Sequence, residues 1–595
     1  MIAILLLSFL SLALAHVERR AQAGALDPEP IALRPLEWGD VNFIATTDTH
    51  GWLQGHPDDP SYSGDFGDFA SFVSHMRDQA THRRTDLFVI DSGDIHHGTG
   101  IADDTKTAGT MTDPIFEKVR YDLLTPGNHE LYDNELANTM YKIYAPRWGN
   151  RYLTSNVFFK DVVTNKTVPL GTQYTTFRGK FGTRVLAYGF MYNFTTPATN
   201  AVVEFCNTTV QQQWFLESLK EESDIIVIVG HNPVRSPELR MVIDAIRQVH
   251  PARPIIVFGG HNHVRDFTQY DARAAGLSAG RFMETVGWMS VDGLRNAACG
   301  IDSSAVDCIG KNLTFHRRYM DTNRYTYITH SMAHPKQKFD TWRGEKITKE
   351  IAEARRKLDV TKVLGQAPMD YYVTRVPFTH PQSIFKWLQD EVLETVLLPT
   401  RPYPAMVVSP TGMVRYDIQK GDFTVDDVFV ICPYHFKFVY FSLKAVHARR
   451  LLEVMANFTK PTGGRDGSGG NHTSGSKEIT DAVQWATHPL APAQADLTPG
   501  YVTMDDYGTG GDDWPHLPVP VYLDAPVNVA SKLAADVPDG TEIDLVFIDY
   551  YAKPVLKALA VLDPNGTYVP TSYRRDFDLA GMFANFAKLK WNKKE

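Results

Sequence analysis

Five short polar motifs follow apolar runs along the first half of the chain, and their side chains are of the kinds that bind metal ions. They are Asp48-Thr49-His50, Gly93-Asp94, Gly127-Asn128-His129, Gly230-His231 and Gly260-His261-Asn262-His263. Together they offer imidazoles, carboxylates and one amide carbonyl, a mixture that suits zinc, manganese, iron or magnesium. Two such ions can clamp an in-line displacement at phosphorus. The set therefore predicts a two-metal hydrolase site.

The spacing inside two of the motifs supports convergence on one point. In an extended backbone, residues i and i+2 project from the same face, so Asp48 and His50 can meet, as can His261 and His263. Glycine directly precedes the polar residues of the other motifs and allows tight turns and close backbone approach. A single Asp-x-His among 21 histidines would say little, and the prediction depends on the ordered set.

The elements that must position these motifs are apolar, β-branched runs, each ending at a motif. They cover residues 41–45, 86–90, 224–229 and 254–258. Their nearly continuous apolar character is typical of strands that are buried on both faces. Amphipathic segments at 67–79 and 237–249 predict helices between them. This alternation predicts an α/β layered domain that binds its ligands in loops at the strand ends.

The second half of the chain has a different character. Residues 341–358 form a charged helix with one narrow apolar stripe, and we interpret 336–362 as a linker helix. Beyond it, we predict a helix over 382–398 and a capping box that begins at Thr424. We also predict a strand over 435–440 and a helix over 442–455 that is capped by a serine. The predicted divisions are residues 1–15, 16–335, 336–362 and 363–595, with a second α/β domain in the last.

Composition limits the class of protein and of ligand. A chain of 595 residues is too long for one core, so at least two domains are expected. The net charge of -9 argues against a nucleic-acid polymer as ligand, because such a surface usually needs a basic excess. A small phosphorylated substrate, most readily a nucleotide, remains compatible with this charge.

The N-terminus and the sequons indicate the secretory pathway. Residues 1–15 are apolar and end in Ala13-Leu14-Ala15, a small-x-small pattern of signal-peptide cleavage. An uncleaved anchor is the alternative, but the run is short for a bilayer, so we expect no stable membrane anchor. We expect an extracellular or vacuolar glycoprotein, because Asn-x-Thr sequons begin at Asn165, Asn193, Asn207, Asn312, Asn457, Asn471 and Asn565.

The four cysteines are too few for a disulfide scaffold. Cys299 and Cys308 flank a short loop that they could close as a local bridge. Cys206 and Cys432 lie far apart in the sequence and are expected to be buried thiols.

The ordered motifs resemble those of the calcineurin-like metallophosphoesterases, specifically their 5′-nucleotidase branch. The resemblance implies an N-terminal layered αββα metallophosphoesterase domain and a C-terminal α/β substrate domain. It also implies that a hydroxide bridging the two metals attacks phosphorus in line, while His129 stabilises the transition state or protonates the leaving oxygen. One metal would be bound by Asp48, His50, Asp94 and His263, and the other by the bridging Asp94 with Asn128, His231 and His261.

One departure from the family concerns the orientation of the catalytic histidine. The family motif Gly-Asn-His-Glu-Phe-Asp places an aspartate where this chain has Tyr132. Asp133 lies one residue further on and is the candidate that orients His129.

Substrate residues are implied in the second half of the chain. Thr509 to Trp514 resembles the family's Gly-Gly-Asp-Gly-aromatic element, and Cys432-Pro433-Tyr434 resembles its Pro-Phe element. Tyr434 and Trp514, with Asp512 beside them, would then hold a nucleobase between two rings, an interaction worth roughly 1–3 kcal/mol per base. Arg415 matches the basic residue of an Asn-x-Gly-Gly-x-Arg motif whose Asn and one Gly are missing here.

The resemblance favours hydrolysis of nucleoside 5′-monophosphates to nucleoside and phosphate. A nucleotide-sugar or cyclic-nucleotide diesterase, and a broad phosphomonoesterase, are alternatives that keep the same metal site. A non-catalytic nucleotide-binding protein is a further alternative. It is disfavoured because all seven ligand positions and His129 are filled.

Overall fold

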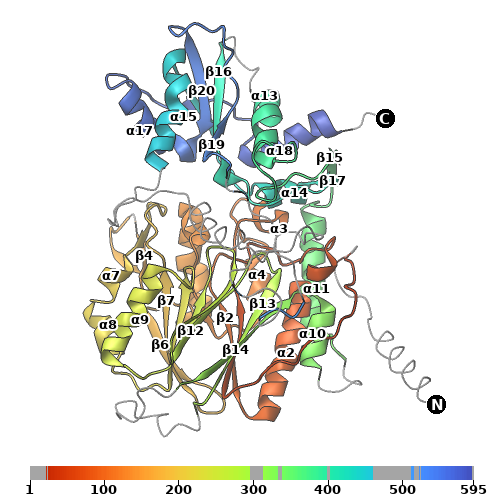
Figure 1. Cartoon of the computed structure of the whole chain (residues 1–595), viewed down its shortest axis with the longest axis vertical. Coiled ribbons are helices and arrows are strands. Elements are labelled where there is room, and N and C mark those ends of the chain that lie inside the picture. Colours follow the sequence, from red (N-terminus) through yellow and green to blue (C-terminus); the bar gives the residue numbers. More distant parts are fainter. Residues whose placement is uncertain are drawn as a thin grey trace, which may run out of the picture.

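The computed structural model describes residues 22, 25–161, 163–294, 312–332, 338–397, 403–459, 505, 511–514, 522 and 524–592. They form an N-terminal and a C-terminal α/β domain that are stacked along the long axis of the molecule (Figure 1). The predicted signal segment, Cys299, Cys308 and Asn471 lie outside the described residues.

Two β-sheets form the centre of the N-terminal domain. The first has the order β14 (Thr314–Asp321), β13 (Thr285–Asp292), β1 (Val41–Thr46), β2 (Asp86–Asp91) and β3 (Leu123–Leu124). The second has the order β11 (Arg265–Asp271), β12 (Ala274–Ala279), β10 (Ile255–Gly259), β9 (Ile225–His231), β7 (Arg184–Met191) and β6 (Tyr174–Arg178). Their facing side chains share one buried cluster, in which the rings of Phe43 and Phe258 lie 5.1 Å apart.

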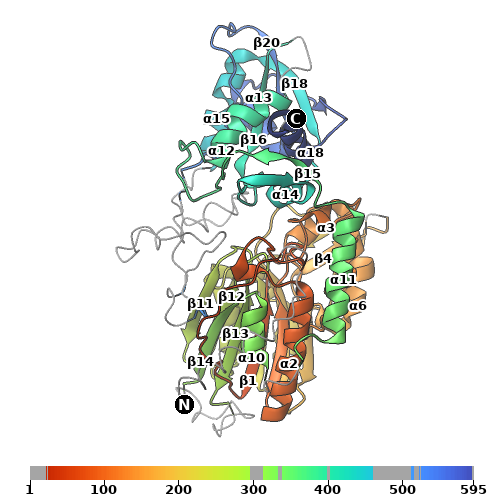
Figure 2. The ribbon, with the colours of Figure 1, turned by 90° about the vertical axis from the view of Figure 1, so that its right-hand side faces the viewer.

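Helices cover the outer faces of both sheets, which confirms the predicted αββα layers. The first sheet is covered by α2 (Phe66–Arg83) and α10 (Arg324–Ser331), with α11 (Trp342–Lys357) packed against α2 (Figure 2). The second sheet is covered by α7 (Cys206–Thr209), α8 (Gln213–Ser218) and α9 (Pro237–Val249) (Figure 1). The bounds predicted for α9 are confirmed. The helix α2 extends beyond its predicted end and stops at Arg84, which takes a left-handed conformation.

The charged helix predicted as a linker lies along the N-terminal domain. The narrow stripe of α11, which includes Ile347, Ile351 and Ala354, is buried in the same core as α2. Gly344 allows this close packing, because a Cβ there would lie 2.1 Å from the Oγ of Ser71. The structure thus places this helix in the packed core of the first domain.

The C-terminal domain contains one five-stranded sheet with helices on both faces. Its order is β19 (Asn528–Ala530), β16 (Ala405–Pro410), β20 (Glu542–Ile548), β18 (Phe438–Lys444) and β21 (Thr571–Ser572). One face packs against α15 (Ala445–Thr459) and α17 (Ala552–Leu562). The other packs against α12 (Ile384–Trp387), α13 (Leu393–Val396), α14 (Val425–Ile431) and α18 (Leu579–Phe586).

Local predictions in this domain had mixed outcomes. Thr424 and Asp427 form the predicted capping box at the start of α14. The predicted serine cap at 442 is wrong, because Ser442 lies inside β18, where it pairs with Asp544, and the helix begins at Ala445. Cys206 and Cys432 are buried free thiols, as expected.

The two domains meet where α14 contacts α3 (Gly100–Asp103). The backbone N–H of Gly100 donates to Asp426 Oδ1 over 2.7 Å, and the His435 ring contacts the Asp103 carbonyl over 2.9 Å. Within the described ranges, no helix combines the length and the apolar character needed to cross a membrane.

Candidate metal centre

The five polar motifs meet at the carboxyl ends of β1, β2, β3, β9 and β10. The strands β1, β2 and β3 run parallel in the first sheet, and β9 and β10 run parallel in the second, so the loops that follow them gather at one edge. All seven predicted metal ligands lie in or directly after these strand ends.

One group of ligand atoms comes from Asp48, His50, Asp94 and His263, which lie within 4.8 Å of one another. The two imidazole Nε2 atoms of His50 and His263 are 3.0 Å apart, and His263 Nε2 lies 3.5 Å from Asp48 Oδ1. His50 Nε2 lies 3.7 Å from Asp94 Oδ2. This arrangement of two carboxylates and two imidazoles fits one divalent ion.

A second group shares Asp94 and adds His231 and His261. His231 Nε2 lies 3.1 Å from Asp94 Oδ2 and 3.1 Å from the Asn128 side-chain oxygen. Asp94 therefore stands between the two groups, where a bridging carboxylate is expected. The two groups together fit two ions, as predicted.

The backbone of the site explains how neighbouring ligands converge. Five of the seven ligands, Asp48, His50, Asp94, His261 and His263, have φ between 46° and 76°. Asp48 and His50 meet in the first group as predicted, whereas His261 and His263 are divided between the two groups. The extended backbone given as the reason for convergence was wrong, since these residues have positive φ. Left-handed backbone at non-glycine residues is uncommon and clusters at functional sites.

Hydrogen bonds outside the ligand groups fix the orientation of the imidazoles. His50 Nδ1 lies 2.7 Å from the His96 carbonyl, and His231 Nδ1 lies 2.7 Å from the Ser92 carbonyl. Each Nδ1 therefore carries the hydrogen, which leaves Nε2 with a lone pair for a metal ion. The Asn128 amide group donates to the Tyr132 hydroxyl over 2.7 Å, so its oxygen faces the site.

Glu130 connects the loops that carry Asp94 and Asn128, a role that the sequence interpretation missed. Its carboxylate accepts backbone N–H groups of Asp94, Ile95 and Gly127 and lies 2.7 Å from His96 Nδ1. Burial opposes its ionisation, but the hydrogen bond and charge of His96, together with the Gly127 N–H and the charge of His231, lower the pKa of Glu130 to about 2. Its position at the end of the Gly-Asn-His-Glu motif was the sequence feature that could have indicated this role.

His129 lies at the edge of the cluster, with Nε2 3.8 Å from Asp94 Oδ2. Its Nδ1 lies 3.1 Å from Nδ1 of His97, so one ring donates to the other. Asp133 is engaged elsewhere, because its carboxylate caps α5 (Asn134–Thr139) by accepting from Glu135 and Leu136. The structure thus places His97, and not Asp133, against His129.

Two of the predicted substrate residues reach the cluster from the C-terminal domain. Arg415 Nη2 lies 3.4 Å from His50 Nε2. The Tyr434 ring lies 6.2 Å from the His129 ring at an interplanar angle of 28°. Burial, followed by the charge of Arg415, lowers the pKa of both His50 and His129 well below the ordinary value. Neutral imidazoles are the form that binds metal.

The other two predicted substrate residues do not join them. Asp512 bridges to Tyr319 of β14 and pairs with Arg265 over 3.2 Å, while the Trp514 indole N–H donates to Thr326 of α10. The backbone N–H of Tyr319 donates to the Gly511 carbonyl, so this segment adds to the free edge of β14. The expected ring sandwich of Tyr434 and Trp514 is therefore corrected, because Trp514 packs on the N-terminal domain.

Comparison with known proteins agrees with both domains. Residues 41–265 match a family model for calcineurin-like phosphoesterases, and residues 370–556 match one for the NAD nucleotidase C-terminal domain. A protein of Arthroderma benhamiae named as a secreted protein is 34% identical over 96% of this chain and 93% of its own length.

Solved structures give the same result. The crystal structure of a 5′-nucleotidase from Candida albicans is 34% identical, with 94% of this chain and 100% of that chain covered at a TM-score of 0.82. A 5′-nucleotidase precursor from Thermus thermophilus, at 14% identity and a TM-score of 0.59, shares the fold. With the metal-binding groups in place, these matches show that the chain belongs to the 5′-nucleotidase family of calcineurin-like metallophosphoesterases and is a metal-dependent phosphoester hydrolase.

Proposed function

We propose that this enzyme hydrolyses nucleoside 5′-monophosphates to nucleoside and phosphate. One observation carries the proposal: a guanidinium and an aromatic ring of the C-terminal domain lie against the metal-binding groups of the N-terminal domain. Arg415 contacts His50, and Tyr434 lies over His129. A phosphate at the metals and an organic group next to it would each meet a suitable partner.

The metal ions, when bound, polarise the phosphate oxygens and lower the pKa of a coordinated water. The side chains supply the remaining electrostatics. Arg415 stabilises the equatorial negative charge that develops on phosphorus, since its guanidinium reaches the same space as the ligand atoms of His50. His129 is neutral, and when its Nδ1 accepts from His97 its Nε2 carries the hydrogen, which can be donated to the transferring phosphoryl group or the leaving oxygen. His97 holds the His129 ring in that orientation.

An aromatic run beside His129 offers the nucleoside a surface. Tyr434 stacks on Phe436 with ring centres 5.4 Å apart, and Phe436 stacks on Tyr550 at 4.6 Å. A base placed against the partly buried rings at the far end of this run, Phe436 and Tyr550, gains contact without the second ring that Trp514 was expected to supply. Base stacking on an aromatic platform is worth roughly 1–3 kcal/mol.

Phosphate release from AMP and from p-nitrophenyl phosphate tests the proposal. Tyr434→Ala is expected to lower kcat/KM for AMP by about 10- to 100-fold, the loss of one stacking contact, and to change the generic ester much less. Trp514→Ala is the matched control, because it removes an aromatic ring that packs on α10. Equal activity of the wild type on both esters would contradict nucleotide specificity and leave a broad phosphomonoesterase.

A second candidate is cleavage of a pyrophosphate bond in a dinucleotide or nucleotide sugar. The match of residues 370–556 to the C-terminal domain of NAD nucleotidases favours it. Chromatography of NAD incubated with the enzyme distinguishes the two activities. Release of AMP from NAD would show pyrophosphate cleavage, whereas intact NAD together with rapid AMP hydrolysis would leave the monophosphatase alone.

We also propose that the enzyme is exported, to the cell exterior or the vacuole. The Arthroderma benhamiae relative is named as a secreted protein. Four sequon asparagines, Asn165, Asn207, Asn312 and Asn565, are exposed and accessible to glycosylation. Glycans on these residues in protein from the culture medium or vacuole would support export. Unmodified protein confined to the cytosol would contradict it.

A further inference from the structure

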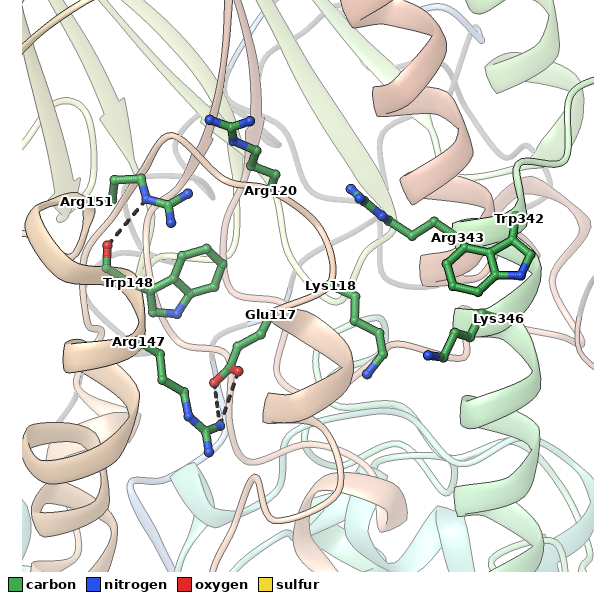
Figure 3. Close-up of a pocket in the computed structure, with 9 residues that line it drawn as sticks. All are labelled: Glu117, Lys118, Arg120, Arg147, Trp148, Arg151, Trp342, Arg343 and Lys346. Carbon is green, nitrogen blue, oxygen red and sulfur yellow. Dashed lines mark hydrogen bonds and ion pairs between the residues drawn. The ribbon is translucent and has the colours of Figure 1, made fainter.

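A cationic pocket lies between α11 and the chain segments around α4 (Asp113–Phe116) and α6 (Ala145–Trp148). Its volume is about 530 Å³, within the range of small-molecule sites. Figure 3 shows its side chains extending from the two flanking segments and from α11 toward a shared space. None of its lining residues belongs to the metal centre described above.

The lining carries an excess of positive charge. One carboxylate, Glu117, faces six cations, namely Lys118, Arg120, Arg147, Arg151, Arg343 and Lys346. The whole chain has a net charge of -9, so the pocket is positively charged although the protein as a whole is negatively charged. Like charges brought together in a concave surface repel one another and concentrate a positive potential. An anion in the pocket would relieve that repulsion.

Existing ion pairs neutralise only part of this charge. Glu117 pairs with Arg147 over 2.9 Å, and Lys118 pairs with Glu350 over 3.0 Å. Within the described part of the chain, Arg120, Arg343 and Lys346 have no carboxylate in ion-pair distance. Arg343 also lies in the first turn of α11, where the helix dipole disfavours a cation.

The pocket also contains two tryptophan rings and an arginine that is held in place by hydrogen bonds. Trp342 is 75% exposed, whereas tryptophan side chains are highly buried on average. The Lys346 ammonium lies 5.4 Å from its ring centre. Arg151 is held by the carbonyls of Tyr121 and Trp148, with its guanidinium over the Trp148 ring. An ordered guanidinium on one side of the pocket and an exposed indole on the opposite side (Figure 3) suit a ligand with both anionic and aromatic parts.

We propose that this pocket binds a nucleoside diphosphate or a closely related small molecule that carries at least two phosphate groups. The phosphates pair with Arg120, Arg343 and Lys346, because guanidinium groups bind phosphate oxygens in bidentate geometry. The base stacks on Trp342. This is a binding site separate from the metal centre, and it does not depend on which phosphoester the metal centre hydrolyses.

Calorimetric titration of the full-length, metal-loaded enzyme with α,β-methylene-ADP, in excess magnesium, tests the proposal. The wild type is expected to bind one equivalent more than Arg343→Glu/Lys346→Glu, whose affinity at the pocket falls by about tenfold or more. The matched control is Lys349→Glu/Arg356→Glu, which makes the same charge change on exposed positions of α11 outside the pocket. AMP hydrolysis is expected to stay within about twofold of wild type in both variants, because they lie outside the metal centre.

Two further titrations identify the part of the ligand that binds. Methylenediphosphonate is expected to compete at the pocket, and Trp342→Ala is expected to weaken the nucleotide analogue but not the diphosphonate. The proposal is overturned if the wild type and Arg343→Glu/Lys346→Glu bind the analogue with the same stoichiometry, or if the control variant loses the same equivalent. Binding of a single-stranded oligonucleotide without binding of the analogue would also overturn it, since the pocket would then serve a polymer.

Discussion

The substitution Glu130→Gln removes one charge from the buried network that joins two metal-binding loops. Each carboxylate oxygen of Glu130 accepts two hydrogen bonds. Oε1 accepts from Ile95 and His96, and Oε2 from Asp94 and Gly127. A glutamine amide keeps one oxygen and turns the other position into a donor, so two donors of the network lose their acceptor.

The magnitude follows from these contacts. A hydrogen bond to a charged group contributes about 1.5–3 kcal/mol, so two lost bonds cost about 3–6 kcal/mol. Breaking a buried ion pair by removing one partner costs about 3–5 kcal/mol, and His96 would keep only Asp113, at 3.0 Å. We therefore expect a loss of about 4 kcal/mol in the free energy of unfolding. Such a change in groups that support metal ligands also weakens metal affinity by roughly 10- to 100-fold.

Urea unfolding and metal analysis measure both effects. At a slope of about 3 kcal/mol per M, the midpoint of the N-terminal domain is expected to fall by about 1 M. Glu135→Gln is the matched control, because Glu135 is exposed and bonds to Lys106 and Thr107 at the surface. It is expected to leave midpoint and metal content unchanged. A Glu130→Gln protein with the stability and metal content of the wild type would refute the reasoning.

Three other residues give separate tests. Arg415→Ala is expected to lower kcat/KM for AMP by about 10²- to 10³-fold while metal content stays unchanged, and loss of metal instead would show a structural role. The hydrogen bond that the His435 ring donates to the Asp578 carboxylate raises the pKa of His435 to about 9. The stability from this protonated ring is therefore fully present below pH 6.5, its unfolded value, and is lost as pH rises through about 9. Between pH 7 and pH 10, the urea midpoint of the wild type is expected to fall more than the midpoint of His435→Gln. The difference is expected to be modest because the ring is partly exposed. Parallel pH profiles of the two proteins would contradict this role of His435. His97→Phe is expected to lower kcat by about tenfold or more with little change in KM, and His97→Asn to restore part of it, whereas equal kcat values would remove His97 as the positioning partner of His129.

The layered fold and the metal ligands were predictable because they depend on local patterns. Strands buried on both faces require continuous apolar runs, and the sites at their ends require the polar residues that follow. The geometry at Asp48 and His50 was not predictable from strand alternation, because left-handed backbone depends on the surrounding loops. Glu130 was visible in its motif, yet its three backbone donors come together only when the loops fold.

The placement of Trp514 was not predictable from the sequence, because it depends on long-range packing. The position of its motif along the chain agreed with a substrate role, but the segment around it adds to the edge of β14 through Tyr319 and Gly511. Pairing of a free strand edge depends on which strand is outermost, and that is set by the order of the whole sheet. Asp133 shows the same limit on a smaller scale, since a helix cap and a histidine partner look alike in sequence.

Titration of metal-free protein with manganese, followed by metal content and phosphate release from AMP, tests the central conclusion most directly. If two ions act together, the wild type binds two equivalents and its activity rises with the second. Asn128→Ala, which lacks a predicted ligand beside the second group, is expected to retain one tightly bound ion and to lose nearly all activity. Full activity with one ion per chain, or with none, would contradict the two-metal account.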